Sequence, residues 1–124
     1  MAGKLEQLQQ LTDDEINRLA ARKVMGWHSA LMGFRDGGTV ECWYWTSDAG
    51  NLTKEADWKP ATDRNHSGQC LAKMVERYVQ FFIWYDQTPH TAWRTPNDEL
   101  TTVVPGNDAR AETIAALLAA YAME

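Results

Sequence analysis

Three helix starts are encoded in the sequence, and the segments between them have the composition of strands. The residues that can cap these helices are Thr12, then Thr62 or Asp63, and finally Asn107 or Asp108. The first start is the most complete, because Glu15 stands three residues after Thr12, as in a capping box. We therefore expect helices from Asp13 to the natural stop at Gly26, from the second cap to about Arg77, and over 109–123.

The segments between the helices predict antiparallel strands. WHSALMGFRDGGTVECWYWT predicts a hairpin around the Asp36–Gly38 turn, and the polar SDAGNLTKEAD after it predicts a loop. VQFFIWYD is apolar at successive positions, so Val79–Tyr85 is predicted to be a central strand that is covered on both faces. A turn at Pro89–His90, a returning strand TAWRT and a last strand ELTTVVP are expected to follow.

This order of elements indicates an α+β fold, because alternating βαβ units are absent from the pattern. We expect one domain over residues 1–124, with a small, mostly antiparallel sheet packed with helices. Residues 1–11 are expected either to extend the first helix or to fray. The second helix should bury a stripe formed by Leu71, Met74, Val75 and Tyr78, and the last helix one formed by Ile114, Leu117, Leu118 and Tyr121.

Composition narrows the classes of function. The formal charge of −5, from 12 basic and 17 acidic residues, argues against a broad nucleic-acid interface. The sequence has no membrane-length apolar run, and MAGKLEQLQQ lacks the apolar centre of a signal peptide, so we expect a cytoplasmic protein without a membrane partner. Cys42 and Cys70 are far apart and are expected to be reduced and buried. No metal or cofactor signature is present.

Three short motifs carry a resemblance to a known family. They are ARKVMGW at the end of the first helix, DWKPATD at the start of the second, and NDARAETIAALLAAY at the last. Together they resemble the phage ABA-sandwich domain family and, more distantly, the NinX-like phage proteins, although Ala61 replaces the usual serine of the W-x-P-x-T-D motif. The resemblance spans about Leu11 to Tyr121 and implies a phage source and an α/β/α layered sandwich. It implies no reaction.

The first candidate site is the start of the second helix. Its free amides carry a partial positive charge, and Arg64, Asn65 and His66 add donors, so a phosphate or a carboxylate is a plausible ligand. The alternative is structural. Thr62 or Asp63 would satisfy these amides, the arginine would pair with a nearby carboxylate, and the tryptophan of the W-x-P motif would cover the helix end.

The second candidate site uses the surplus of aromatic residues, which include six tryptophans. The aromatic residues weighed for it are Trp43, Trp45, Phe82, Trp84 and Trp93. A nucleobase that stacks on such a ring gains about 1–3 kcal/mol. Trp84 and Trp93 are the preferred stacking residues, with Arg94 or Arg64 holding a phosphate. The alternative is that these rings form the core and a homo-oligomer interface.

A catalytic site has weaker support in the sequence. His66 and Cys70 lie four residues apart on one helix, and a cysteine–histidine pair is the minimum for thiol nucleophilic chemistry. No third orienting group can be named, so a packed cysteine beneath a capping histidine is the preferred interpretation. A metal site formed by His66, Cys70 and His90 has no better support.

Three functional hypotheses from different classes follow. The preferred one is a non-enzymatic phage anti-defence protein that binds and sequesters a nucleotide-derived host immune signal. The second is an inhibitor that binds a host defence protein, which the acidic surface favours. The third is a small enzyme that uses Cys70 and His66. The phage context of the first two hypotheses rests on the family resemblance and not on the residues alone.

Overall fold

The computed structural model describes residues 4–35, 39–47, 52–77, 79–86, 88–94, 102–106 and 108–123. Its helices are α1 (Lys4–Gln9), α2 (Asp13–Leu19), α3 (Arg64–Glu76) and α4 (Ala109–Ala122), with a π-helical turn η1 (Ala20–Val24) and a 3₁₀ turn η2 (Glu55–Asp57). Its strands are β1 (His28–Arg35), β2 (Thr39–Thr46), β3 (Leu52–Lys54), β4 (Gln80–Asp86), β5 (Thr88–Arg94) and β6 (Thr102–Pro105).

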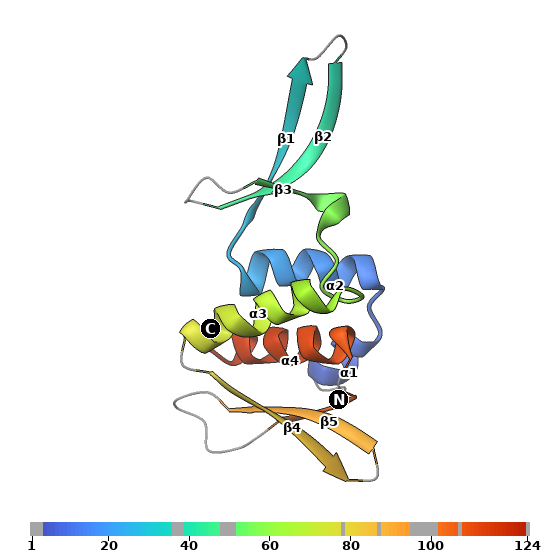
Figure 1. The fold of residues 1–124 in the computed structure, drawn as a ribbon, viewed down its shortest axis with the longest axis vertical. Coiled ribbons are helices and arrows are strands. Elements are labelled where there is room, and N and C mark those ends of the chain that lie inside the picture. The colour runs from blue at the N-terminus through green and yellow to red at the C-terminus, as the bar shows by residue number, and fades with distance from the viewer. Residues whose placement is uncertain are drawn as a thin grey trace.

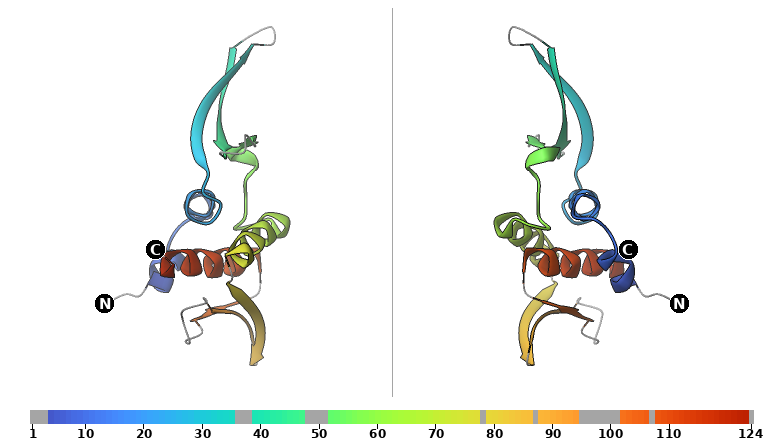
Figure 2. Two further views of the ribbon diagram at one scale, coloured as in Figure 1. Left: turned by 90° about the vertical axis from the view of Figure 1, so that its left-hand side faces the viewer. Right: turned by 90° about the vertical axis from the view of Figure 1, so that its right-hand side faces the viewer.

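The strands form two antiparallel sheets, in the orders β1-β2-β3 and β4-β5-β6. The helices lie between them (Figure 1), and the β1–β2 hairpin extends away from the helices in every view (Figure 2). The predicted α+β class is therefore confirmed, and so is the antiparallel pairing. The layers, however, are arranged differently from the order that the resemblance implied, because the helices form the middle of the molecule and a sheet lies on either side.

Helix α4 is the centre of the core. Every residue from Ala111 to Ala120 is buried, so the helix is covered all round and not along one stripe only. It packs against the other three helices, the π turn, β5 and β6. Small alanine side chains permit these close approaches, and a helix that is apolar on all sides is typical of a buried position. Its N-cap is Asp108, which accepts a hydrogen bond from the backbone N–H of Ala111 at 2.8 Å.

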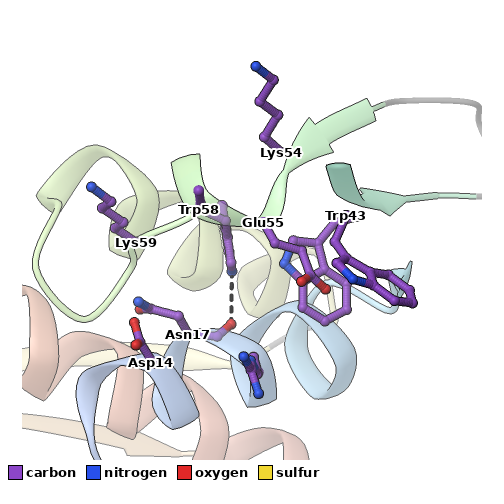
Figure 3. Close-up of a pocket in the computed structure, with 10 residues that line it drawn as sticks. Asp14, Asn17, Trp43, Lys54, Glu55, Trp58 and Lys59 are labelled. Atoms are coloured by element: carbon purple, nitrogen blue, oxygen red, sulfur yellow. Dashed lines mark hydrogen bonds between the residues drawn. The ribbon is translucent and has the colours of Figure 1, made fainter. Parts of the chain in front are cut away.

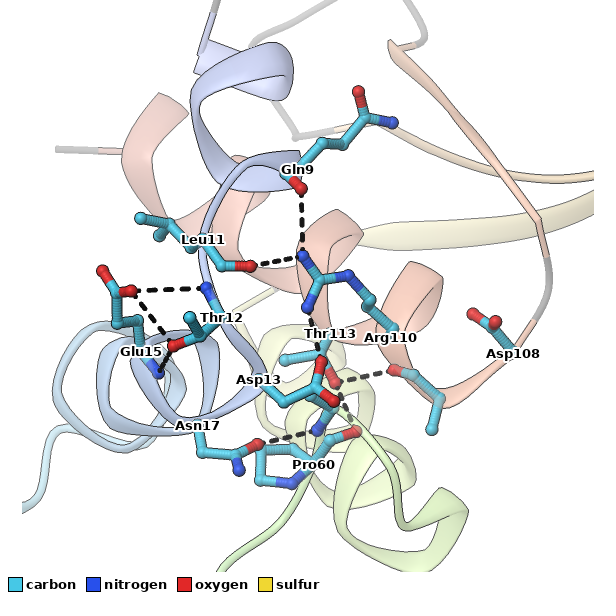
Figure 4. Close-up of polar contacts among 12 residues, drawn as sticks. Gln9, Leu11, Thr12, Asp13, Glu15, Asn17, Pro60, Asp108, Arg110 and Thr113 are labelled. Carbon is cyan, nitrogen blue, oxygen red and sulfur yellow. Dashed lines mark hydrogen bonds and ion pairs between the residues drawn. The ribbon is translucent and has the colours of Figure 1, made fainter.

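The first helix start is confirmed in detail. The Thr12 hydroxyl accepts a hydrogen bond from the Glu15 N–H at 3.2 Å, and the Glu15 carboxylate accepts one from the Thr12 N–H at 3.3 Å. The preceding residues form the separate helix α1. Arg110 fastens the α1–α2 junction to α4 by donating to the backbone oxygens of Gln9 and Leu11 and pairing with Asp13 at 2.6 Å (Figure 4). The helical segment ends after the π turn, as predicted at Gly26, whose φ of 71° lies in the left-handed region.

The prediction that Val79–Tyr85 is a central strand was wrong. β4 is an edge strand, and β5 is the central strand of its sheet. Pro89 and His90, expected in a turn, pair with Tyr85 and Trp84 inside the β4–β5 ladder. The local sequence identified the strands, but their order in the sheet depends on which strands pair by hydrogen bonds. β6 returns to the far side of β5 and leaves β4 at the edge.

Two further details differ from the predictions. The segment after the first hairpin was expected to be a loop, but Leu52–Lys54 pairs with β2 as a third strand and Glu55–Asp57 forms a 3₁₀ turn. In α3, Met74 is buried as predicted, whereas Val75 is 55% exposed and lies outside the buried face that Ser67, Cys70 and Met74 form. The predicted stripe residue Tyr78 lies outside the described residues, and so does the Asp36–Gly38 turn.

Candidate functional site

At the start of α3 the polar groups are paired within the chain. Asp63 is the N-cap, and its carboxylate accepts a hydrogen bond from the Asn65 N–H at 2.8 Å. The Arg64 guanidinium pairs with Glu112 at 3.3 Å, and the other carboxylate oxygen of Glu112 accepts a hydrogen bond from the Ser67 hydroxyl at 2.9 Å. A capping carboxylate therefore occupies the position that an anionic ligand would take at this helix end.

His66 supports Trp58. The backbone N–H of Lys59 donates a hydrogen bond to Nδ1 of His66 at 3.0 Å, and the imidazole stacks on the Trp58 ring with a centroid distance of 5.1 Å. Trp27 packs edge-on against the same indole, with a distance of 4.7 Å between the ring centroids. His66 therefore fixes the entry of the chain into α3, which is the structural alternative foreseen for this stretch.

Asn17 on α2 holds the other side of the same segment. Its backbone oxygen accepts a hydrogen bond from Nε1 of Trp58 at 3.0 Å, and its side-chain oxygen accepts one from the Ala61 N–H at 2.8 Å. The Thr113 hydroxyl of α4 donates to the Pro60 oxygen at 2.8 Å. Buried polar groups need such partners, so the W-x-P-x-T-D motif joins α2, α3 and α4 and fixes their relative positions.

The other predicted ligand-binding residues are not at an accessible site that the structure describes. Trp93 is 2% exposed and belongs to the core, so its ring faces are not open to a ligand. The side chains of Trp84 and Arg94 lie outside the described part of the structure. Arg64, Asn65 and His66 lie together at the start of α3 as expected, but the contacts described above are with groups of the same chain and hold the fold together.

Cys70 is fully buried in the core. Burial raises the pKa of its thiol to about 12, so the thiol keeps its proton at neutral pH, whereas a nucleophilic cysteine reacts as the thiolate. Within the described ranges, no cluster of three or more histidine, cysteine or acidic residues is arranged to hold a metal ion. None of the described helices combines the length and the apolarity that a membrane span requires.

A cavity of about 510 Å³ lies between α2, the base of β2 and the β3–η2 segment (Figure 3). Its lining comes from three parts of the chain that are distant in sequence. The lining residues are Asp14, Asn17, Arg18, Trp43, Trp45, Lys54, Glu55, Ala56, Trp58 and Lys59. The volume lies within the range of small-molecule sites, about 300–1,000 Å³.

The three tryptophans of this cavity differ in how much of each ring is available. Trp58 is buried and is already in contact with His66 and Trp27. Trp45 is buried too, and the Arg22 guanidinium of the π turn lies 5.7 Å from the centre of its ring. Trp43, two residues before Trp45 on the same face of β2, is 52% exposed. Its indole is therefore the ring on which a flat ligand could stack.

The charged groups around the cavity are of both signs. Arg18, Lys54 and Lys59 are exposed, and none of their side chains forms an ion pair or a hydrogen bond with the described residues. This contrasts with Arg64 and Arg110, which are paired with carboxylates. The acidic residues of the lining are Asp14 and Glu55, and Glu55 accepts a hydrogen bond from the Ser29 hydroxyl at 2.8 Å. The cavity is thus lined by an exposed indole and by three cations without partners among the described residues, of which Lys54 extends from the other face of the sheet because it is in register with Tyr44.

Part of this site could have been found from the sequence. Asp14, Asn17 and Arg18 follow the i, i+3, i+4 spacing of one helix face, and Trp43 was among the aromatic residues considered. The pairing that brings β3 beside β2 was missed, because LTK is short and polar. Without that pairing, the sequence does not indicate that Lys54 and Lys59 line the same cavity as Trp43 and Trp45.

Comparisons with protein-family models, with curated proteins and with solved structures found no match for this chain.

Proposed function

We propose that this protein is a non-enzymatic binding module that sequesters a small anionic ligand with a flat ring, of the nucleotide class. The observation that carries the proposal is a cavity lined by the half-exposed ring of Trp43 and by Arg18 and Lys59, two cations whose side chains have no partner among the described residues. This site replaces the start of α3 and Trp93 as the place of binding. The ligand class stays the same as the one expected from the sequence.

The chemistry of the cavity suits such a ligand. A base that stacks on an indole gains about 1–3 kcal/mol, and ammonium or guanidinium groups form charge-assisted hydrogen bonds with phosphate oxygens. Lys54 is in register with Tyr44 and therefore extends from the face of the sheet opposite to Trp43, so Arg18 and Lys59 are the preferred phosphate ligands. Sequestration is favoured over turnover because Cys70, the nucleophile considered from the sequence, is buried and protonated.

The biological setting of the proposal comes from the family resemblance. A phage accessory protein that captures a nucleotide-derived immune signal in the cytoplasm of the host cell would need a ring-stacking surface and cations, but no catalytic group. The cavity offers both features. The anti-defence role is thus a proposal that adds a phage context to a binding site argued from geometry.

The proposal is tested by a thermal-shift screen with cyclic dinucleotides and ADP-ribose derivatives. A ligand at 100 times its dissociation constant stabilises the folded state by about 2.7 kcal/mol. Trp43→Ala is expected to reduce the shift strongly, whereas Val75→Ala, which truncates another exposed apolar residue outside the cavity lining, is expected to retain it. Recovery of intact ligand after heat denaturation supports sequestration, and recovery of a cleaved product would identify an enzyme instead.

The cations have a separate test. Arg18→Gln and Lys59→Gln should weaken binding and reduce its dependence on salt, because each removes a partly screened charge pair. Trp43→Ala should weaken binding with little change in the salt dependence that remains. Arg64→Gln is the matched control, because Arg64 is paired with Glu112 and does not line the cavity. If Arg64→Gln weakened binding more than Arg18→Gln, the ligand would have to be placed at the start of α3.

One observation favours a second candidate function, the inhibition of a host protein by direct binding. The β1–β2 hairpin extends away from the helices (Figure 1), and Trp43 is an exposed aromatic residue on it. Exposed tryptophans are common anchors of protein interfaces. The two functions separate experimentally, because a protein inhibitor would give no thermal shift with any nucleotide and would lose its protein partner when Trp43 is replaced.

A further inference from the structure

β4 is an edge strand with the composition of a central one. It has seven residues, QFFIWYD, and the five between Gln80 and Asp86 are all aromatic or aliphatic. Both sets of alternate positions are therefore apolar, which is typical of a strand with neighbours on both sides. In the described structure, however, β4 pairs with β5 alone.

The other edge strands carry features that discourage further pairing. β3 has three residues and includes Lys54, β6 has four and ends at Pro105, and β1 contains Gly33 and ends at Arg35. Short length, proline and basic residues are known protections of sheet edges. β4 has seven residues and contains neither proline nor lysine, and its charged residue, Asp86, is at its end. A long, apolar and unprotected edge is a template for pairing with another strand.

We propose that the outer edge of β4 pairs antiparallel with β4 of a second copy of this chain, which joins the two three-stranded sheets into one of six strands. A two-fold axis makes such an interface self-complementary. The register that pairs the whole strand has its centre at Ile83 and brings Gln80 opposite Asp86 of the second copy. The two polar ends of the strand then meet each other, and all five apolar positions meet apolar positions.

This pairing also explains why the sequence predicted a central strand. In the dimer β4 has β5 on one side and the second β4 on the other, so its position agrees with its composition. The inference is independent of ligand binding, because the cavity is formed by α2, β2, β3 and η2 and not by this sheet.

The test uses opposite charges at position 80 and measures the dimer dissociation constant by sedimentation of the full chain. Gln80→Glu faces Asp86 of the second copy, and a cross-strand charge pair contributes about 0.2–1 kcal/mol. With two such pairs in a symmetric dimer, the dissociation constant should rise roughly 2- to 30-fold. Gln80→Lys should lower it by a similar factor.

The same two substitutions should change the stability of the sheet within one chain in the opposite direction. Gln80 is in register with Arg94 inside the sheet, so glutamate at position 80 favours the monomer's own ladder and lysine disfavours it. The sign of the change in dimer affinity therefore separates pairing between copies from a change in the sheet itself. The unfolding free energy of each variant at low protein concentration serves as the control.

Cross-linking provides a second readout. Adjacent strands bring opposite Cα atoms within the 4.4–6.8 Å range of a disulfide, so Ile83→Cys should give a covalent dimer on mild oxidation. Wild type and Val75→Cys, which places a thiol on the exposed part of α3, should give none. A chain that remains monomeric at all concentrations overturns the proposal. So does a dimer that fails to cross-link at position 83 and does not respond to charge at position 80.

Discussion

Trp58 and Trp43 both line the cavity, but the chain holds them differently. Trp58 is 2% exposed, donates a hydrogen bond to Asn17 and lies between His66 and Trp27. Trp43 is 52% exposed. The difference shows how structural and available aromatic residues can be separated in a protein with six tryptophans: a structural ring is covered by other side chains, and an available ring still has an open face.

The arginines show the same contrast. Arg64 and Arg110 are paired with carboxylates of the chain and connect its helices. Arg18 lines the cavity and has no such partner in the described structure. A cation that is already paired in the folded chain contributes less to a new anionic ligand than one that is not, because binding must first break the existing pair. The following predictions test this division, from the largest expected effect to the smallest.

The largest effect is expected for Trp58→Ala. The substitution leaves a cavity beside Asn17 and removes the stacking partner of His66, so the free energy of unfolding should fall by about 3–5 kcal/mol. Urea denaturation followed by circular dichroism measures this change. A loss below about 1 kcal/mol would mean that the ring is not part of the structural connection.

Cys70 should make the stability depend on pH. Burial raises the pKa of its thiol from 9.0 to about 12. The unfolded chain therefore loses this proton at a lower pH than the folded chain. The stabilisation is complete below about pH 9 and declines by about 1.4 kcal/mol for each pH unit up to about pH 12.

Urea unfolding at about pH 8 and about pH 10 measures this decline, with Cys70→Ala as the control for all other titrating groups. The wild type should lose about 1.4 kcal/mol more than the variant between the two values. Equal losses would indicate an accessible thiol, and the catalytic interpretation of His66 and Cys70 would then regain support.

Thr12→Ala should lower the free energy of unfolding by about 1 kcal/mol, because the hydroxyl that accepts from the Glu15 N–H is lost. Thr62→Ala is the matched control. Both threonines were candidate caps in the sequence, but Asp63 is the N-cap of α3, and the Thr62 variant should be nearly neutral. Chemical denaturation of both variants measures the two losses of unfolding free energy. Equal losses would contradict the assignment of Asp63 as the N-cap of α3.

The smallest effect on stability is expected for Trp43→Ala, about 1 kcal/mol or less, because the side chain is 52% exposed and substitutions at exposed positions usually change the free energy of unfolding little. The same variant should show the largest loss of ligand binding. A strongly destabilised Trp43→Ala protein would show that this ring supports the hairpin, and the cavity would then lose its proposed stacking surface. Thermal denaturation without ligand provides the measurement.

The sequence by itself determined the elements whose causes are local. Thr12 with Glu15, Asp63 and Asp108 begin helices because their side chains satisfy amides only two or three residues away. The hairpin and the β4–β5 pair follow from neighbouring runs of strand-forming residues. The α+β class followed from the order of these elements.

Only the tertiary structure decided which surfaces meet. β4 became an edge strand because β6 pairs with the far side of β5, and α4 became central because other elements cover it on all sides. The start of α3 became structural through Glu112 and Asn17, which are 48 and 44 residues away from the groups that they hold. The pairing of β3 with β2 brings residues 54–59 into the lining of the cavity that Trp43 also lines. Such contacts depend on the whole packed arrangement, and no local pattern of residues encodes them.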